Sequence, residues 1–193
     1  DITLSGYVGD PSIEGSDKGS DAFVGGLTDL LDTSETKVTS LIRGENHGKI
    51  EFTSDFKCAN AVRTAGIVAR QENATMFYVE DCWNSGDVIY SGTVSARSNG
   101  VYRMAGCFGA VTAGSQTTKG YIINSGNVSY NGTNTSTVYV GGVYGNRSIE
   151  MTLAEGETEG KVINTGNISC SGTAGSDIRV GGVAGVTSAI YAP

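Results

Sequence analysis

Residues 123–145 read I-N-S-G-N-V-S-Y-N-G-T from Ile123 to Thr133 and, after a short polar loop, V-Y-V-G-G-V-Y-G from Val138 to Gly145. Both motifs recur along the chain. The second glycine of the G-G pair stands at Gly26, Gly66, Gly106, Gly142 and Gly182, at spacings of 40, 40, 36 and 40 residues. The N-x-G turn begins at Asn46, Asn84, Asn124 and Asn164, at spacings of 38, 40 and 40. A period of this length predicts a solenoid, a propeller or another repeat array.

Each repeat carries short segments in which apolar residues alternate with polar ones. After the N-x-G turn the apolar pairs are Ile50/Phe52, Val88/Tyr90, Val128/Tyr130 and Ile168/Cys170. Before the G-G pair the inward positions are Val62/Thr64, Tyr102/Met104, Val138/Val140 and Ile178/Val180. A period of two residues is typical of a strand with one buried face. A third, less regular apolar patch indicates a third strand in each repeat.

Three short strands per repeat fit either a propeller blade or one coil of a β-solenoid. A blade needs a four-stranded antiparallel meander, whereas equivalent positions here carry similar side chains in successive copies, which favours stacked coils with parallel pairing. We therefore predict an all-β, parallel β-solenoid (β-helix) of about five coils, forming one domain over residues 1–193. Its repeats are an atypical first copy at 1–45 and further copies at 46–83, 84–123, 124–163 and 164–193, the last incomplete.

The corners and ends of the predicted stack carry their own expectations. Asn46, Asn84, Asn124 and Asn164 should form a column at one corner, where asparagine tolerates left-handed backbone and its amides can bond along the stack. In the first copy, residues 27–32 follow the G-G pair and suggest a helical turn in a capping coil. The last coil shows no cap, which leaves open a longer parent chain or a covering subunit.

Composition and cysteine spacing restrict the partners and cofactors. The net charge of −7 and the pI near 4.6 disfavour nucleic acid and anionic membranes, and there is no apolar run long enough to insert into a bilayer. The cysteines Cys58, Cys82, Cys107 and Cys170 have no C-x-x-C spacing, and the chain has a single histidine. We predict no metal site and no cofactor, and the redox state of the cysteines stays open.

The combination of V-G-G-V-x-G with I-N-S-G-N-V and S-G-T, seen at residues 122–145 and 162–185, resembles GLUG-type repeats of cell-surface, adhesin-like proteins of gut Bacteroidetes. The resemblance covers about the last two-thirds of the chain. It implies a right-handed parallel β-solenoid on an exported bacterial protein, at the cell surface or outside the cell. It carries no catalytic residues to this sequence.

Candidate ligand-binding residues come from breaks in the repeat pattern. Arg63, Arg103 and Arg179 occupy one outward column with Tyr139, and a row of this kind can stack on sugars or pair with acidic glycans. The competing interpretation is a solvated face of the solenoid. Trp83 lies beside the asparagine corner and is a further candidate, and His47 is expected to be a surface turn residue. An acidic loop at residues 10–21 suggests calcium, although its spacing fits no calcium-loop motif.

The sequence favours a non-catalytic, exported surface module that acts as a structural spacer or an adhesin-like scaffold. The alternative is a carbohydrate-binding or polysaccharide-degrading β-helix domain, with carboxylates such as Glu72, Glu80 and Asp81 or a glutamate group at residues 150–159 as its acids. No catalytic residues are predicted. Open partners are glycans, host or cell-surface proteins, end-to-end self-association and further domains of a longer chain.

Overall fold

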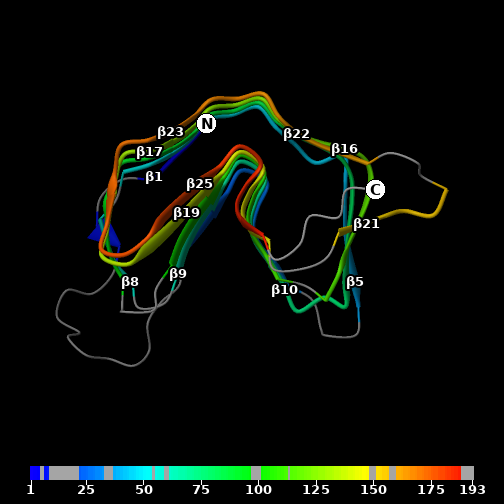
Figure 1. The fold of residues 1–193 in the computed structure, drawn as a ribbon, viewed down its shortest axis with the longest axis horizontal. Coiled ribbons are helices and arrows are strands. Elements are labelled where there is room, and N and C mark those ends of the chain that lie inside the picture. The colour runs from blue at the N-terminus through cyan, green and yellow to red at the C-terminus, as the bar shows by residue number, and fades with distance from the viewer. Residues whose placement is uncertain are drawn as a thin grey trace.

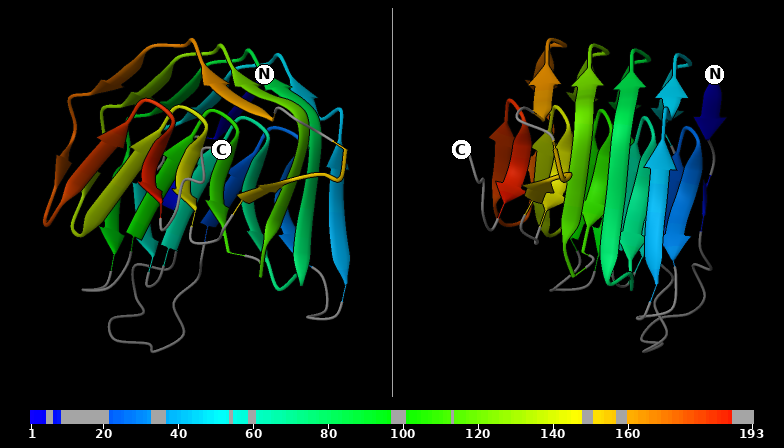
Figure 2. Two further views of the ribbon diagram at one scale, coloured as in Figure 1. Left: turned by 45° about the vertical axis from the view of Figure 1, so that its right-hand side comes forward. Right: turned by 90° about the vertical axis from the view of Figure 1, so that its right-hand side faces the viewer.

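The protein is a parallel β-solenoid. A computed structural model describes residues 1–4, 7–8, 22–32, 37–53, 55–58, 61–96, 101–112, 114–147, 151–156 and 160–187. Across these residues the regular elements are all strands, and each strand pairs in parallel with the equivalent strand one coil away. Figure 1 shows the chain running counterclockwise while successive coils approach the viewer, and Figure 2 shows the same advance from the side, so the coil is right-handed. The predicted all-β parallel solenoid is confirmed, with about four full turns.

Five sheets run along the stack, where the sequence indicated three strand segments per coil. Sheet A consists of β1 (Ile2–Leu4), β7 (Ile50–Phe52), β12 (Val88–Tyr90), β17 (Val128–Tyr130) and β23 (Ile168–Cys170). Sheet B consists of β2 (Tyr7–Val8), β8 (Asp55–Cys58), β13 (Thr93–Ala96), β18 (Thr133–Asn134) and β24 (Thr173–Ala174). Sheet C consists of β3 (Ala22–Gly25), β9 (Ala61–Ala65), β14 (Val101–Ala105), β19 (Thr137–Gly141) and β25 (Ile178–Gly181).

The other two sheets follow the G-G turn. Sheet D consists of β4 (Thr28–Asp32), β10 (Val68–Glu72), β15 (Phe108–Val111), β20 (Tyr144–Arg147) and β26 (Ala184–Thr187). Sheet E consists of β5 (Val38–Ile42), β6 (Glu45–Asn46), β11 (Met76–Asn84), β16 (Gln116–Asn124), β21 (Met151–Leu153) and β22 (Lys161–Asn164). Within the described residues, no helix has the length and hydropathy needed to cross a membrane.

Each coil has the outline of an arch with two lobes (Figure 1). One lobe is enclosed by sheets A and B on one side and by sheet C on the other. Aromatic rings stack in its core: the centres of the Tyr90 and Tyr130 rings are 5.7 Å apart and the rings are nearly parallel, and the Tyr102 ring centre lies 4.7 Å from that of Tyr90. The other lobe lies between sheets D and E, with Phe77, Phe108 and Tyr144 among its buried residues. The inward positions predicted for sheets A and C are buried in the three middle coils.

The two lobes meet where the N-x-G turn contacts the G-G turn. The asparagines predicted at this corner form a continuous ladder: Nδ2 of each donates to Oδ1 of the next at 2.7 Å, from Asn46 through Asn84 and Asn124 to Asn164. Each Nδ2 also donates to the carbonyl oxygen two residues later in its own turn, as at Gly126, 2.8 Å from Asn124. The expected left-handed backbone is wrong, because these asparagines end strands and point inward; the described non-glycine residues with positive φ are Arg43, Asn73 and Asp81.

The asparagine ladder explains why glycine recurs at the second position of the G-G pair. A Cβ placed on Gly106 would overlap the side-chain amide of Asn124 and the backbone oxygen of Gly142. A Cβ on Gly66 would overlap Asn84 in the same way. Only glycine lets the inner turn approach the buried amides this closely. The N-x-G and G-G motifs are therefore the two sides of one recurring contact, in which Asn124 faces Gly106 and Asn164 faces Gly142.

The first copy departs from its predicted structure. Residues Thr28–Asp32 form strand β4 and pair with β10, so the expected helical turn is wrong. Thr28 and Leu30 keep the register of Val68 and Arg70, and the preceding glycine pair makes the same turn as in other coils. The parallel partner strand offers this segment a full set of backbone hydrogen bonds, which a single helical turn cannot supply.

Candidate functional site

The predicted column of arginine and tyrosine lies on sheet C. Phe23, Arg63, Arg103, Tyr139 and Arg179 are paired in register, one from each coil. Cations and rings contact one another along the column: the Arg63 guanidinium lies 5.0 Å from the Phe23 ring centre, and Arg179 lies 5.5 Å from that of Tyr139. Arg103 approaches Tyr139 from the other side, at 6.0 Å. Phe23 belongs to this column and was missed by sequence reasoning, because the first copy aligned poorly.

The column is only partly solvated, because the outer face of sheet C approaches sheet D inside the arch. A Cβ on Gly109 of sheet D would lie 3.4 Å from the Cβ of Arg63. Arg63 is only 7% exposed, whereas the side chain of Arg179 in the last coil is 51% exposed. Arg70 of sheet D also reaches the Phe23 ring, at 5.2 Å, and forms an ion pair with Glu72. The solvated-face interpretation is therefore wrong for Arg63 and describes Arg179.

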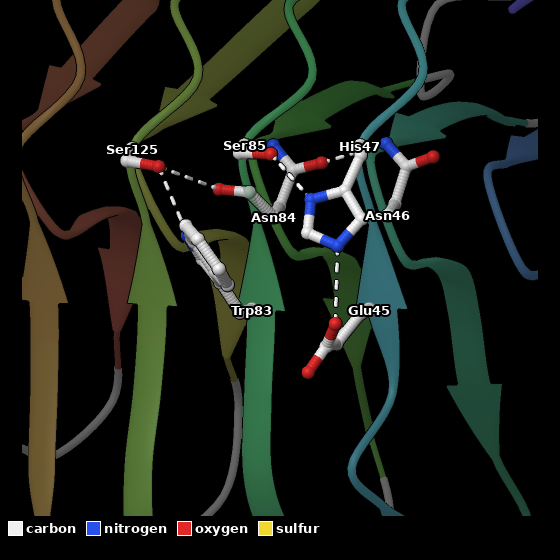
Figure 3. A network of polar contacts seen from close by, with 7 residues as sticks. All are labelled: Glu45, Asn46, His47, Trp83, Asn84, Ser85 and Ser125. Carbon is white, nitrogen blue, oxygen red and sulfur yellow. Dashed lines mark hydrogen bonds and ion pairs between the residues drawn. The ribbon is translucent and has the colours of Figure 1, made fainter.

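A second polar network lies on the outer surface at the asparagine corner (Figure 3). His47 Nδ1 is 2.7 Å from Ser85 Oγ in the next coil, and His47 Nε2 is 3.0 Å from Glu45 Oε2. The Trp83 indole N–H donates to Ser125 Oγ one coil further on, at 2.9 Å. The rings of His47 and Trp83 meet edge to face at 5.1 Å. These outward side chains are thus connected across three coils.

The chain of carboxylate, imidazole and hydroxyl formed by Glu45, His47 and Ser85 has the order of a hydrolase triad. Such triads work beside preorganised oxyanion donors in a site that excludes water. Here the side chains of His47 and Glu45 are 55% and 52% exposed, so water competes at both ring contacts. What the corner does present is Trp83, which is 40% exposed and whose indole N–H is held by Ser125.

Sequence reasoning placed His47 and Trp83 at this corner and missed Glu45, Ser85 and Ser125. The signal that points to them is the repeat itself. Trp83 pairs with Glu45 on one side and with Ile123 on the other, and the following N-x-G residues stack in the same order. Because outward residues at equivalent positions are one coil apart, long side chains of one copy reach short hydroxyls of the next.

The candidate carboxylates take part in separate local contacts. Glu72 pairs with Arg70 on sheet D. Glu80 accepts a hydrogen bond from the Tyr78 hydroxyl at 2.7 Å, which together with Lys119 lowers the pKa of its carboxyl. Asp81 Oδ1 accepts from the backbone N–H of Tyr121 at 3.0 Å. Each acid thus has its own structural partner in the stack.

Cysteine side chains pack in the lobes. Cys82 and Cys107 are buried, Cys170 is partly buried, and all three are free thiols. Burial raises the pKa of Cys82 to about 11 and that of Cys107 well above its ordinary value. Across the described residues no group of three or more His, Cys, Asp or Glu side chains could hold a metal ion. The acidic loop 10–21, the glutamates at 150, 157 and 159 and the side chain of Cys58 lie outside the described part.

Sequence reasoning also missed a polar cluster buried in the second lobe. Gln116 Nε2 donates to the Tyr144 hydroxyl at 2.8 Å. Arg147 is buried beside the same ring, with its guanidinium carbon 5.6 Å from the ring centre, and burial lowers the pKa of Arg147. In the other copies the Arg147 position holds Leu31, Gln71, Val111 and Thr187, so this cation is specific to one coil.

The predicted binding residues do not form one site. The arginine and tyrosine column belongs to sheet C inside the arch, and Trp83 belongs to sheet E on its outer side (Figure 1). A small ligand bound at one would not contact the other. No family model, curated protein or solved structure matches this chain.

Proposed function

We propose that this chain is a rigid, non-catalytic module of an exported surface protein, acting as a spacer or an adhesin-like scaffold. The observation that carries the proposal is the asparagine ladder, whose 2.7 Å bonds join the first four coils at the junction of the two lobes. Such a ladder resists bending and slippage between coils, because both would break buried hydrogen bonds. The resemblance to GLUG-type repeats supports the exported location.

Outer polar contacts support the same role. Ser129 and Ser169 lie 2.7 Å apart through their hydroxyls, and Ser171 donates to Asn131 at 2.8 Å. Thr173 donates to Thr133 at 3.2 Å in sheet B. These hydroxyls bond along the stack, as expected of a surface that reinforces a rod. A rod with regular faces suits the display of side chains and loops at a distance from the cell.

Two experiments test the proposal. Antibodies against the chain should label intact cells of the organism that makes it; labelling that requires permeabilised cells contradicts the exported location. Incubation with a panel of acidic and neutral polysaccharides should release no new reducing ends. Release that is lost in a Glu80→Gln or Asp81→Asn variant would instead assign a polysaccharide-degrading activity.

A second candidate, carbohydrate binding, is favoured by the fixed and exposed ring of Trp83. An aromatic face held by its own N–H bond loses little freedom when a sugar stacks on it. A glycan array should then show binding that falls in a Trp83→Ala variant. An Arg179→Ala variant provides the matched test of the column inside the arch. Binding unchanged in both variants would remove these two surfaces as the site.

A further inference from the structure

Two exposed aromatic side chains lie on the outer face of sheet E in neighbouring coils. Trp83 of β11 is 40% exposed, and Tyr121 of β16 is 45% exposed. Both strands have paired neighbours on each side, since β11 lies between β5 with β6 and β16, and β16 lies between β11 and β21 with β22. The exposure of the two rings therefore belongs to this face of the stack and is not caused by an end of the chain.

The pairing of β11 with β16 sets the distance between the two aromatic residues. Trp83 is in register with Ile123, and Tyr121 lies two residues before Ile123 on the same strand. One step between coils and two residues along a strand separate the Cα atoms of Trp83 and Tyr121 by about 8 Å. Ile123 shares this outward face and is partly buried, so an apolar surface connects the two rings.

Neighbouring side chains hold both rings in place. His47 of the first coil meets the Trp83 ring edge to face at 5.1 Å, and Figure 3 shows it on the side of that ring nearer the first coil. Lys161, from the coil that follows Tyr121, has its Nζ atom 5.9 Å from the Tyr121 ring centre. The pair of rings is thus flanked by His47 and Lys161, with the surface over Ile123 between them. Rings held in this way lose little freedom when a ligand binds.

A fixed carboxylate lies beside the pair of rings. Asp81 sits where the register of β11 with β16 shifts, and its backbone is left-handed, with a φ of 47°. Such bulges redirect side chains and are frequent at binding sites. Asp81 Oδ1 accepts from the backbone N–H of Tyr121 at 3.0 Å, and a Cβ on Gly120 would overlap this oxygen. Oδ2 has no hydrogen-bond partner within the described part of the chain, so this exposed oxygen can accept from a ligand.

We propose that Trp83, Tyr121 and Asp81 form a binding site for a neutral glycan chain. The C–H faces of sugar residues pack on the two aromatic rings, and sugar hydroxyls donate to the Asp81 carboxylate. An acidic glycan is disfavoured, because its charged groups would lie beside the open oxygen of Asp81 and the whole chain carries a net charge of −7. The inference rests on the carbohydrate-binding candidate above, and it names the residues of the site and the class of ligand.

Trp83 is the single tryptophan of the chain, so its fluorescence reports binding at this site directly. A β-glucan, a mannan and the acidic polygalacturonate are each titrated into the protein while the emission and its quenching by acrylamide are recorded. A neutral polysaccharide should shift the emission and reduce quenching, whereas polygalacturonate should do neither. Tyr121→Ala should weaken the binding about fivefold to tenfold, because one of two stacking contacts is lost, and Tyr121→Phe should keep it. Asp81→Asn keeps a residue that tolerates left-handed backbone and should weaken the binding about fivefold.

Retention in native gels that contain the polysaccharide tests Trp83→Ala, which lacks the fluorescent probe. This variant should lose retention, whereas Tyr139→Ala, which removes an aromatic ring from sheet C, should keep it. Circular dichroism melts confirm that each variant is folded.

The possible failures separate this inference from the functions proposed above. A wild-type chain that binds none of the polysaccharides overturns both the inference and the carbohydrate-binding candidate, and it leaves the rigid surface module in place. Neutral-glycan binding that persists in Trp83→Ala and Tyr121→Ala, or that leaves the Trp83 emission unchanged, overturns the inference alone. Binding of polygalacturonate only, lost in Arg179→Ala, also overturns it and places the ligand on the sheet C column.

Discussion

Replacing Asn124 with alanine should destabilise the solenoid far more than the same change at Asn164, one coil away in the same ladder. Asn124 is fully buried and makes three side-chain hydrogen bonds, to Asn84, Asn164 and the Gly126 carbonyl, each of 2.7 or 2.8 Å. The alanine variant removes all three. It also leaves an amide hydrogen of Asn84 and the oxygen of Gly126 buried without these partners.

The magnitude follows from the groups left behind. An unsatisfied buried polar group costs about 1–3 kcal/mol, and two such groups in the middle of the stack give a loss of about 3–5 kcal/mol in the free energy of unfolding. Asn164 is partly exposed and makes two such bonds, so its alanine variant leaves one amide hydrogen of Asn124 without this acceptor, at a position closer to water. We expect its alanine variant to lose about 1 kcal/mol.

Urea denaturation followed by circular dichroism and by fluorescence measures both variants. Trp83 is the single tryptophan and lies one residue before Asn84, so its emission reports on this corner. Hydrogen exchange adds the coil-by-coil view, and the strands on both sides of Asn124 should lose protection first. If Asn124→Ala and Asn164→Ala lost the same stability within experimental error, the ladder would not be what joins the coils.

Three further predictions use neighbouring features. Gly106→Ala should cost about 3 kcal/mol or more in thermal or urea unfolding, because its Cβ would overlap Asn124. Tyr90→Phe should be neutral or slightly stabilising, since its buried hydroxyl has no hydrogen-bond partner among the described residues. Tyr102→Phe should lose about 1 kcal/mol of stability, because it removes the 3.0 Å hydrogen bond to Thr64. Thermal melts of the two variants, compared with wild type, distinguish the two effects. The free energy of unfolding should fall as pH rises from 9 towards 11, because folding raises the pKa of Cys82 from 9.0 to about 11 and the unfolded chain therefore loses this proton first. Urea titrations across this pH range should show a smaller fall for a Cys82→Ala variant.

The sequence was sufficient to predict the columns that face the interior. Alternation such as Val138/Val140 and Val128/Tyr130 reports a buried face directly, and register follows once equivalent copies are stacked. These residues are fully buried as predicted. The asparagine ladder was also predicted, because the N-x-G turn recurs four times at spacings of 38, 40 and 40 residues. The partner of the ladder could not be predicted from the aligned copies. Gly106 and its equivalents lie in the G-G turn, whereas the asparagines that they contact lie in the N-x-G turn.

The arch shape lay beyond the sequence because it depends on contacts between outer faces. Sheet B has strands as short as Thr133–Asn134, too short for a pattern to show. In sheet D the buried strands include small residues on the face that approaches sheet C, such as Gly109 and Gly145, so alternation disappears. Outward position was therefore equated with solvation, and the burial of Arg63 was missed. That Trp83 and the arginine column lie on different sides of the arch could likewise not be predicted, because their separation depends on how the two lobes pack.

Variation in repeat length shows where this architecture can change. From the ladder asparagine to the next G-G glycine the chain takes 22 residues between Asn84 and Gly106 but 18 between Asn124 and Gly142. In both cases the second glycine must arrive against the asparagine of its own lobe junction, because no Cβ fits there. The difference is therefore absorbed in the connection from sheet B to sheet C, which makes no part of that contact. Connections of this kind can change length without disturbing the ladder. These connections and the outward columns can therefore vary, while the two glycine motifs keep the coils in register.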